Sequence, residues 1–143
     1  MIKVLIDSDV ILDLLPDREP FGEQSERVFE SLTTEHIQGY VTVAALLNIY
    51  YIARKTLGRN AALDCVRRLL ETDGLEVFAV DKRHVRIALN SAMTDFEDAV
   101  QAAVAEISEL DFIVTRDKRD FRLSSVPGVL PEEFFENLEN WRH

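Results

Sequence analysis

The sequence has a single cysteine and no long apolar run, so it offers little for disulfide bonds or for a membrane span. Cys65 is the only cysteine among 143 residues, so an internal disulfide and a cysteine-rich zinc site are excluded, and a buried structural thiol is the favoured interpretation. No segment approaches the roughly 20 consecutive apolar residues that a membrane span needs, and the first residues lack the basic and apolar regions of a signal peptide. We therefore expect a cytoplasmic protein that makes no membrane contact.

Positive charge is also scarce. The chain has 16 Lys and Arg residues against 26 Asp and Glu residues, which gives a formal net charge of -10. Non-specific DNA binding depends on many contacts from Lys and Arg to phosphates, so a broad DNA-binding surface is disfavoured. A nucleic-acid substrate remains compatible, because acids gathered around a divalent cation carry part of this charge and the cation reverses its sign locally.

Histidine is rare as well. His36, His84 and His143 lie far apart and show no metal-ligand spacing. A histidine metal site and a Ser-His-Asp triad are therefore disfavoured.

Apolar runs of strand length alternate with helical patterns along the chain. We predict strands at 2–6, 40–43, 75–80, 112–114 and 129–130, and helices at 10–15, 20–35, 44–57, 60–72, 81–92, 96–110 and from Pro131 onward. Gly39 is expected to end the connection before the second strand. This alternation predicts an α/β fold in which residues 1–143 form a single domain, a three-layer α/β/α sandwich with a mostly parallel central sheet of about five strands.

Acidic residues follow two of the predicted strands. Asp7 and Asp9 come after the first strand, and Asp117 and Asp120 come after the fourth. In open α/β sheets the ligand-binding crevice lies outside the carboxyl ends of the strands, so these residues are candidates for a site. Clustered carboxylates suit Mg²⁺ or Mn²⁺, which can activate water for attack at phosphorus.

A second pair of acids begins an Ala-rich helix. Asp95 and Asp98 are three residues apart, which places them on one helical face if the helix includes both. Ala102 is the next residue on that side, and its small side chain allows the helix to approach the sheet closely. The pair can then join the acids at the strand ends.

Several of these acids also have a purely structural interpretation. Asp9 is as suited to capping the following helix as to contacting a metal, and Asp95 is better suited to capping than to ligation. Asp120 equally fits a solvated turn. Asp7 and Asp98 are harder to explain structurally, since a desolvated carboxylate needs a partner.

Three motifs resemble those of PIN domains, the nuclease fold of the toxins in VapC-type toxin-antitoxin pairs. They are residues 7–9 (Asp-Ser-Asp), 95–99 (Asp-Phe-Glu-Asp-Ala) and 113–121 (Ile-Val-Thr-Arg-Asp-Lys-Arg-Asp-Phe). The resemblance extends over nearly the whole chain. It implies a metal-dependent endoribonuclease, usually dimeric, that hydrolyses RNA phosphodiester bonds with Mg²⁺ or Mn²⁺.

The resemblance also implies roles for individual residues. By position, Asp7, Asp98 and Asp117 would be the catalytic, metal-binding acids. Thr115 would orient the carboxylate of Asp117, and Asp120 would support the site. Further supporting residues are Asp9, Asn48 and Asp95, and the basic residues expected to contact phosphates are Arg116, Lys118 and Arg119.

Asn48 departs from the family pattern. The family commonly has a Glu in the helix after the second strand, and the matching position holds Asn48. An amide is a neutral oxygen ligand and cannot act as a general base, so one negative charge is missing. A ligand role for Asn48 and a role limited to hydrogen bonding with neighbouring acids are equally compatible with the sequence.

Two other functions compete with the nuclease. A PIN-like module that has lost activity through Asn48 would bind RNA or protein without cleaving it. A phosphatase with Asp7 as nucleophile is a weaker alternative, since an apolar strand ending in Asp-x-Asp also opens haloacid-dehalogenase enzymes. The residues 10–12 (Val-Ile-Leu) fit that family poorly.

Two protein partners are implied by the resemblance. A toxin would pair with an antitoxin that covers the acidic groove, and a homodimer is expected. Tyr50 and Tyr51, inside an apolar helix, fit core or dimer contacts better than stacking on bases.

Overall fold

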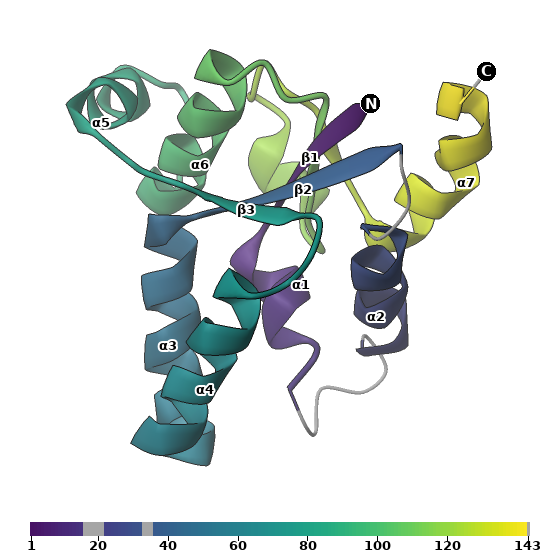
Figure 1. The fold of residues 1–143 in the computed structure, drawn as a ribbon. Helices are drawn as coiled ribbons and strands as arrows, with labels where there is room; N and C mark the ends of the chain where they lie inside the picture. The colour runs from purple at the N-terminus through teal and green to yellow at the C-terminus, as the bar shows by residue number, and fades with distance from the viewer. Residues whose placement is uncertain (16–21, 33–35, 143) are drawn as a thin grey trace.

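The fold is built on one parallel sheet (Figure 1). The computed structural model describes residues 1–15, 22–32 and 36–142. The five strands are β1 (Ile2–Ile6), β2 (Ile37–Thr42), β3 (Leu75–Phe78), β4 (Phe112–Val114) and β5 (Gly128–Val129). They lie in the order β3-β2-β1-β4-β5, and every neighbouring pair is parallel. The predicted α/β class and parallel sheet are confirmed.

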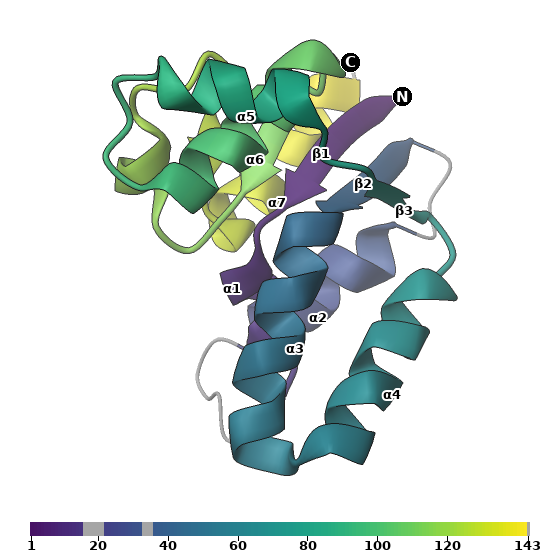
Figure 2. The same ribbon diagram turned by 90° about the vertical axis from the view of Figure 1, so that its left-hand side faces the viewer.

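The helices occupy the connections between the strands. They are α1 (Ser8–Leu12), α2 (Gly22–Ser31), α3 (Val43–Leu57), α4 (Arg59–Leu70), α5 (Lys82–Leu89), α6 (Phe96–Ile107), the 3₁₀ helix η1 (Lys118–Phe121) and α7 (Pro131–Arg142). Figure 2 shows α3 and α4 running side by side, with α5 and α6 at the opposite end of the molecule. None of the helices in the described ranges is long and apolar enough to cross a membrane.

The sheet separates two apolar cores. Val4 and Ile6 of β1 face a core completed by α1, α2, α3, α4 and α7, whereas Leu5 between them faces α6 and η1. Ala102 packs in this second core, so the predicted close approach of the Ala-rich helix to the sheet is confirmed. Side chains of a strand alternate between the two faces of the sheet, which is why one apolar run can serve both cores.

Several predicted boundaries are corrected by the structure. The first helix begins at Ser8 and not at position 10, because Asp7 caps it. The second strand begins at Ile37, which pairs with Ile2, so Gly39 lies inside the strand and not in the connection. A Cβ at Gly39 would lie 2.8 Å from Leu32 Cδ2, which explains why a glycine stands there. The ends of the helix predicted at 20–35 fall outside the described residues.

Other predicted elements extend too far. The third strand ends at Phe78, the helix after it ends at Leu89, and the Ala-rich helix ends at Ile107. Each helix ends three residues earlier than predicted, and the residues that follow these ends, Asn90 and Ser108, are the C-caps. Apolar side chains continue past these ends, so hydrophobic patterning alone does not reveal where the backbone leaves the helix.

The order of the strands creates a switch point beside β1. The chain places β2 and β3 on one side of β1 and then crosses to place β4 and β5 on the other side. Ligand sites of open α/β sheets form outside the carboxyl ends of strands at such a point. The residues after Ile6 and Val114 border this crevice.

Candidate active site

Asp7 is the buried centre of the acidic cluster. It follows β1 directly, and its side chain is only 6% exposed. One carboxylate oxygen, Oδ1, accepts from the Ser8 backbone N–H at 2.8 Å and from Gln101 Nε2 at 2.8 Å. The other, Oδ2, accepts from the Thr115 hydroxyl at 2.9 Å. These contacts tie β1, α6 and β4 to a single carboxylate.

Burial controls the protonation of Asp7. Desolvation raises its pKa, while the hydrogen bonds from Gln101, Thr115 and Ser8 oppose that rise. Such donors favour the charged form because they replace the water that burial removes. Each oxygen of an ionised carboxylate has two lone-pair sites, so Asp7 keeps the capacity to bind a cation while accepting these bonds.

The start of α6 supplies further acids. Asp95 caps the helix and accepts from the Asp98 backbone N–H at 2.9 Å, so its predicted capping role is confirmed. Glu97 and Asp98 lie in the first turn, and Gln101 follows on the same side of the helix at a spacing of four and three residues. This local geometry carries both acids toward Asp7.

Asp98 has the clearest sign of crowded negative charge. Its pKa is raised to about 7, first by burial and then by the neighbouring carboxylates of Asp7, Asp95, Asp120 and Glu97. Like charges disfavour ionisation because each carboxylate raises the electrostatic cost of the next. A cation placed among them would remove this cost.

The loop after β4 completes the cluster. Asp117 and Asp120 are both exposed, and Asp117 precedes the first turn of η1. Desolvation and the charge of Asp117 raise the pKa of Asp120, which places the two acids close together. Asp120 also contributes to the raised pKa values of Asp7 and Asp98.

Thr115 has a different hydrogen-bond partner from the expected one. Its hydroxyl donates to the carboxylate of Asp7 and accepts from the backbone N–H of Asp117 at 3.1 Å. It therefore orients the buried acid directly and positions Asp117 through the backbone.

Asn48 lies beside the acids, as its position in α3 predicts. Its Nδ2 donates to the Ser8 hydroxyl at 3.1 Å and to Glu97 Oε1 at 3.4 Å. Thr42 caps α3 at the carboxyl end of β2, which places Asn48 in the second turn, near the crevice. The amide thus bridges α1 and α6.

Asp9 is not the helix cap, since Asp7 takes that position. The carboxylate of Asp9 accepts a long hydrogen bond, 3.5 Å, from the backbone N–H of Arg116. Burial and the charge of Asp7 raise its pKa to about 7. Asp9 therefore belongs to the same negative cluster, on its α1 side.

Two of the three basic residues expected at the substrate have protein partners. The Nε of Arg116 lies 2.6 Å from Oδ2 of Asp13, whose side chain is 1% exposed, and Lys118 pairs with Glu133 at 3.0 Å. Arg116 therefore connects the loop after β4 to the end of α1, a structural role that the sequence did not reveal. Arg119 is exposed.

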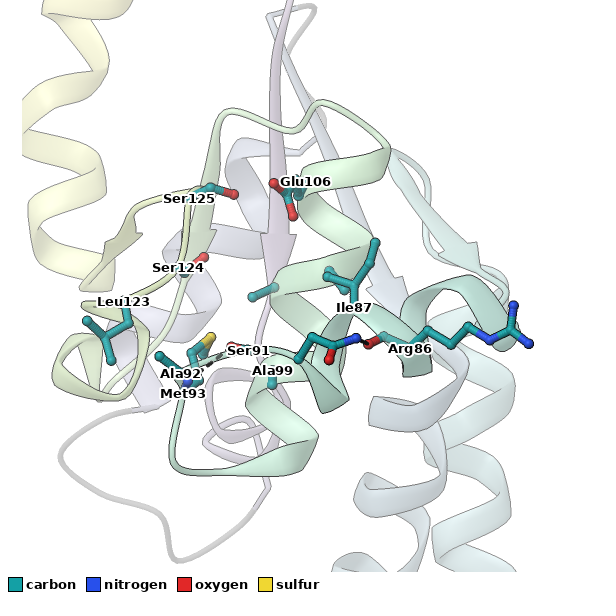
Figure 3. A pocket seen from close by; sticks show the side chains of 13 residues that line it. Arg86, Ile87, Ser91, Ala92, Met93, Ala99, Glu106, Leu123, Ser124 and Ser125 are labelled. Carbon is teal, nitrogen blue, oxygen red and sulfur yellow. Dashed lines mark hydrogen bonds between the residues drawn. The ribbon is translucent and has the colours of Figure 1, made fainter.

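Basic residues nevertheless line a broad hollow beside Asp117. Its volume is about 800 Å³, and its lining includes Arg116, Lys118, Arg119 and Arg122. A second hollow, of about 460 Å³, lies between α5, α6 and the segment after η1 (Figure 3). Among the described residues that line this second hollow, Glu106 is the one acid, and the clustered acids are not among them. The acidic cluster borders the basic hollow and not the one in Figure 3.

The donor set suits a hard divalent ion. Among the described residues, no group of three acidic, His or Cys side chains forms a ready-made cage. Mg²⁺ rarely uses such a cage, because it keeps several waters and is usually held by one or two carboxylates. A buried, oriented carboxylate at Asp7, facing acids with raised pKa values, fits this mode of binding.

Two residues of the cluster were missed in the sequence. Glu97 and Gln101 both belong to α6, and Gln101 is fully buried among alanines. A glutamine three residues after Asp98 on an Ala-rich helical face was the available signal, since a buried amide needs polar partners.

Comparison with known proteins places this fold in a family. A family model described as PIN domain matches residues 3–119, and the chain belongs to this family. Membership of the family supports assignment of the chain to the nucleases. A search of curated protein sequences gives no match.

Several solved structures resemble most of this fold. VapBC2 from Rickettsia felis, bound to a fragment of promoter DNA, has a TM-score of 0.72 at 11% identity and covers 90% of this chain and 98% of its own. DNA-bound VapBC from Salmonella typhimurium has a TM-score of 0.69 at 18% identity, covering 92% and 99%. VapC20 from Mycobacterium tuberculosis, described as a toxin that cleaves the sarcin-ricin loop, has a TM-score of 0.68 at 14% identity, covering 82% and 92%.

Proposed function

We propose that the protein is a metal-dependent endoribonuclease and the toxin of a toxin-antitoxin pair. The observation that carries the proposal is the buried carboxylate of Asp7 at the switch point of the sheet, with Asp98 near it, whose pKa is raised to about 7 by burial and by Asp7 and other carboxylates. Asp117 lies next to Asp120, whose charge contributes to the raised pKa values of Asp7 and Asp98. This concentration of negative charge favours a divalent cation, Mg²⁺ or Mn²⁺.

The chemistry is divided between the ion and the protein. A bound divalent ion lowers the pKa of water and neutralises charge that develops on the phosphate. Asp7, Asp98 and Asp117 would hold the ion, while Gln101 and Thr115 keep the carboxylate of Asp7 in one orientation. Asp9, Asp95 and Asp120 would add charge or order around these three acids.

RNA is the proposed substrate. The basic hollow next to Asp117 offers Arg119 and Arg122 to backbone phosphates, and VapC20, which has a similar fold, is described as a toxin that cleaves the sarcin-ricin loop. Such a substrate implies a cytoplasmic location. Arg116 is assigned a structural role here, because its guanidinium pairs with buried Asp13.

The phosphatase alternative finds little support in the geometry. Both oxygens of Asp7 accept hydrogen bonds inside a buried environment. A carboxylate nucleophile must reach a phosphorus atom in line, and a side chain 6% exposed offers little access for that attack. Asp7 is better suited to holding an ion from within.

Two protein partners are part of the proposal. The similar folds from Rickettsia felis and Salmonella typhimurium are described as VapBC complexes, which supports an antitoxin that covers the acidic crevice. A homodimer is supported by an exposed apolar stripe on α3, formed by Val43, Leu47 and Tyr51, which are 41%, 57% and 61% exposed. A spacing of four residues places all three on one helical face.

The test is cleavage of a mixed single-stranded RNA pool with Mn²⁺ or Mg²⁺. We expect wild-type protein to cut the RNA and EDTA to prevent it, while Asp98→Asn lowers the rate by about 100-fold or more. Asp64→Asn, the same chemical change at an exposed position of α4, is the control for a contaminating nuclease and should cut normally. Equal cleavage by the Asp98→Asn protein would overturn the proposal, and RNA binding without any cleavage would favour the non-catalytic module.

A further inference from the structure

We infer that Glu97 supplies the metal-site carboxylate that is missing at position 48, where α3 has Asn48. The carboxylate at this part of the site then comes from α6 and not from α3. This inference rests on the proposed function. It concerns which residues of this chain complete the charge of the site.

The first argument is position. Glu97 Oε1 lies 3.4 Å from Nδ2 of Asn48, so the carboxylate of Glu97 is next to the end of the side chain at position 48. Asn48 also donates to the hydroxyl of Ser8, whose backbone N–H holds Asp7. A carboxylate at the end of Glu97 is therefore inside the cluster even though it comes from a different helix.

The second argument is charge. Glu97 and Asp98 both lie in the first turn of α6, the helix whose Gln101 donates a hydrogen bond to Asp7, so Glu97 adds a carboxylate at this end of the helix. The side chain of Glu97 is only partly exposed and is not a solvated surface acid.

The third argument is the identity of residue 48. A second carboxylate at position 48 would face Glu97 at hydrogen-bond distance and repel it, whereas the amide donates to it. Asn48 can hold Oε1 of Glu97 while Oε2 stays available for a cation. The neutral Asn48 and the negative Glu97 together keep one negative charge at this part of the site.

The experiment measures Mn²⁺ binding without RNA, by titration calorimetry and by the electron paramagnetic resonance signal of free Mn²⁺. Glu97→Gln should weaken binding by about tenfold or more. Adding Asn48→Asp to this variant returns the charge to α3 and should restore most of the affinity, with the hydrogen bond between the two side chains reversed. Glu106→Gln, the same change at an exposed position of α6, should bind Mn²⁺ like wild type.

The outcomes separate this inference from the proposed function. The inference about Glu97 is overturned if Glu97→Gln binds Mn²⁺ normally. It is also overturned if Glu97→Gln weakens binding and adding Asn48→Asp fails to restore it. If Asp98→Asn still loses Mn²⁺ binding in that case, the proposed function stands. If Asp98→Asn binds Mn²⁺ normally as well, both fail. Thermal unfolding in EDTA verifies that every variant is folded.

Discussion

Buried charge is stabilised differently at Asp7 and at Asp98. Asp7 accepts three hydrogen bonds, which oppose the effect of burial on its pKa. Asp98 lies among carboxylates, and its pKa rises to about 7. Ionising Asp98 in the metal-free protein therefore acts against folding, a cost that a bound cation would remove.

The raised pKa of Asp98 predicts a pH dependence of stability. The folded protein binds a proton at Asp98 that the unfolded chain, with a pKa near 3.8, has already lost, so stability falls as pH rises from about 4 to about 7. In EDTA, Asp98→Asn should raise the melting temperature relative to wild type near pH 8 and have little effect near pH 4. Thermal unfolding across this range measures the difference, and a constant difference at all pH values would contradict the prediction.

The ion pair between Arg116 and Asp13 predicts a stability effect at a residue expected to bind substrate. Removing the guanidinium takes away a cation that lies 2.6 Å from a carboxylate only 1% exposed, so Arg116→Met should lower the free energy of unfolding by about 3 kcal/mol. Lys118→Met, which breaks the exposed pair with Glu133, should cost less than about 1 kcal/mol. Urea denaturation compares the two variants. Equal losses would show that burial of Asp13 does not matter.

At the scale of elements, the acidic cluster depends on where helices and strands begin. Asp7 caps α1, Thr42 caps α3 and Asp95 caps α6, and all three helices start beside the carboxyl edge of the sheet. An N-cap side chain satisfies backbone N–H groups that have no partner in the helix. The caps therefore fix where each helix begins, and this in turn positions the functional side chains in the first turns of the helices.

The turn before β3 offers a test of element packing. Gly74 has a φ of 78°, its carbonyl accepts from the Gly39 N–H at 2.8 Å, and an added Cβ would collide with the backbone carbonyl of Leu32. Gly74→Ala should lower the free energy of unfolding by about 3 kcal/mol, from backbone strain and steric overlap.

Gly58→Ala is the matched control for this test. Gly58 has a φ of 87°, but a Cβ there would meet no atom within 4 Å, so only backbone strain of about 1 to 2 kcal/mol is expected. Chemical denaturation measures both variants. A loss at Gly58 as large as the loss at Gly74 would mean that contact with Leu32 has no role.

At the scale of the whole molecule, the charge of -10 sets how copies and partners can meet. Like charge on two copies opposes association, so a dimer requires an apolar surface to offset the repulsion. Val43, Leu47 and Tyr51 on α3 provide exposed apolar side chains at one face.

The proposed dimer is therefore sensitive to charge on α3. Leu47→Glu should shift the protein from dimer to monomer in light scattering coupled to size-exclusion chromatography. Leu70→Glu introduces the same charge at another exposed leucine, 59% exposed and outside the stripe, and should leave the dimer intact. A dimer that persists in the Leu47→Glu protein would place the interface elsewhere.

Local patterns were sufficient to predict the existence of the strands and of most helices. The apolar run before Asp7 and the Ala-rich helix after Asp95 are recognisable because burial imposes a period on the side chains. Their ends were less predictable. The first residue of β2 is set by pairing with Ile2, and Gly39 is required by its close contact with Leu32 in the folded protein, which no local pattern shows.

The sequence by itself determined the parallel α/β fold and the acids at its carboxyl edge, because the period of apolar side chains and the residues that follow each strand are local features of the chain. Only the tertiary structure decided how these acids are held. In the folded protein Thr115 and Gln101 donate hydrogen bonds to Asp7. Arg116 forms an ion pair with Asp13, and Asn48 donates a hydrogen bond to Glu97. These contacts link residues far apart in the chain, so no spacing or period in the sequence encodes them.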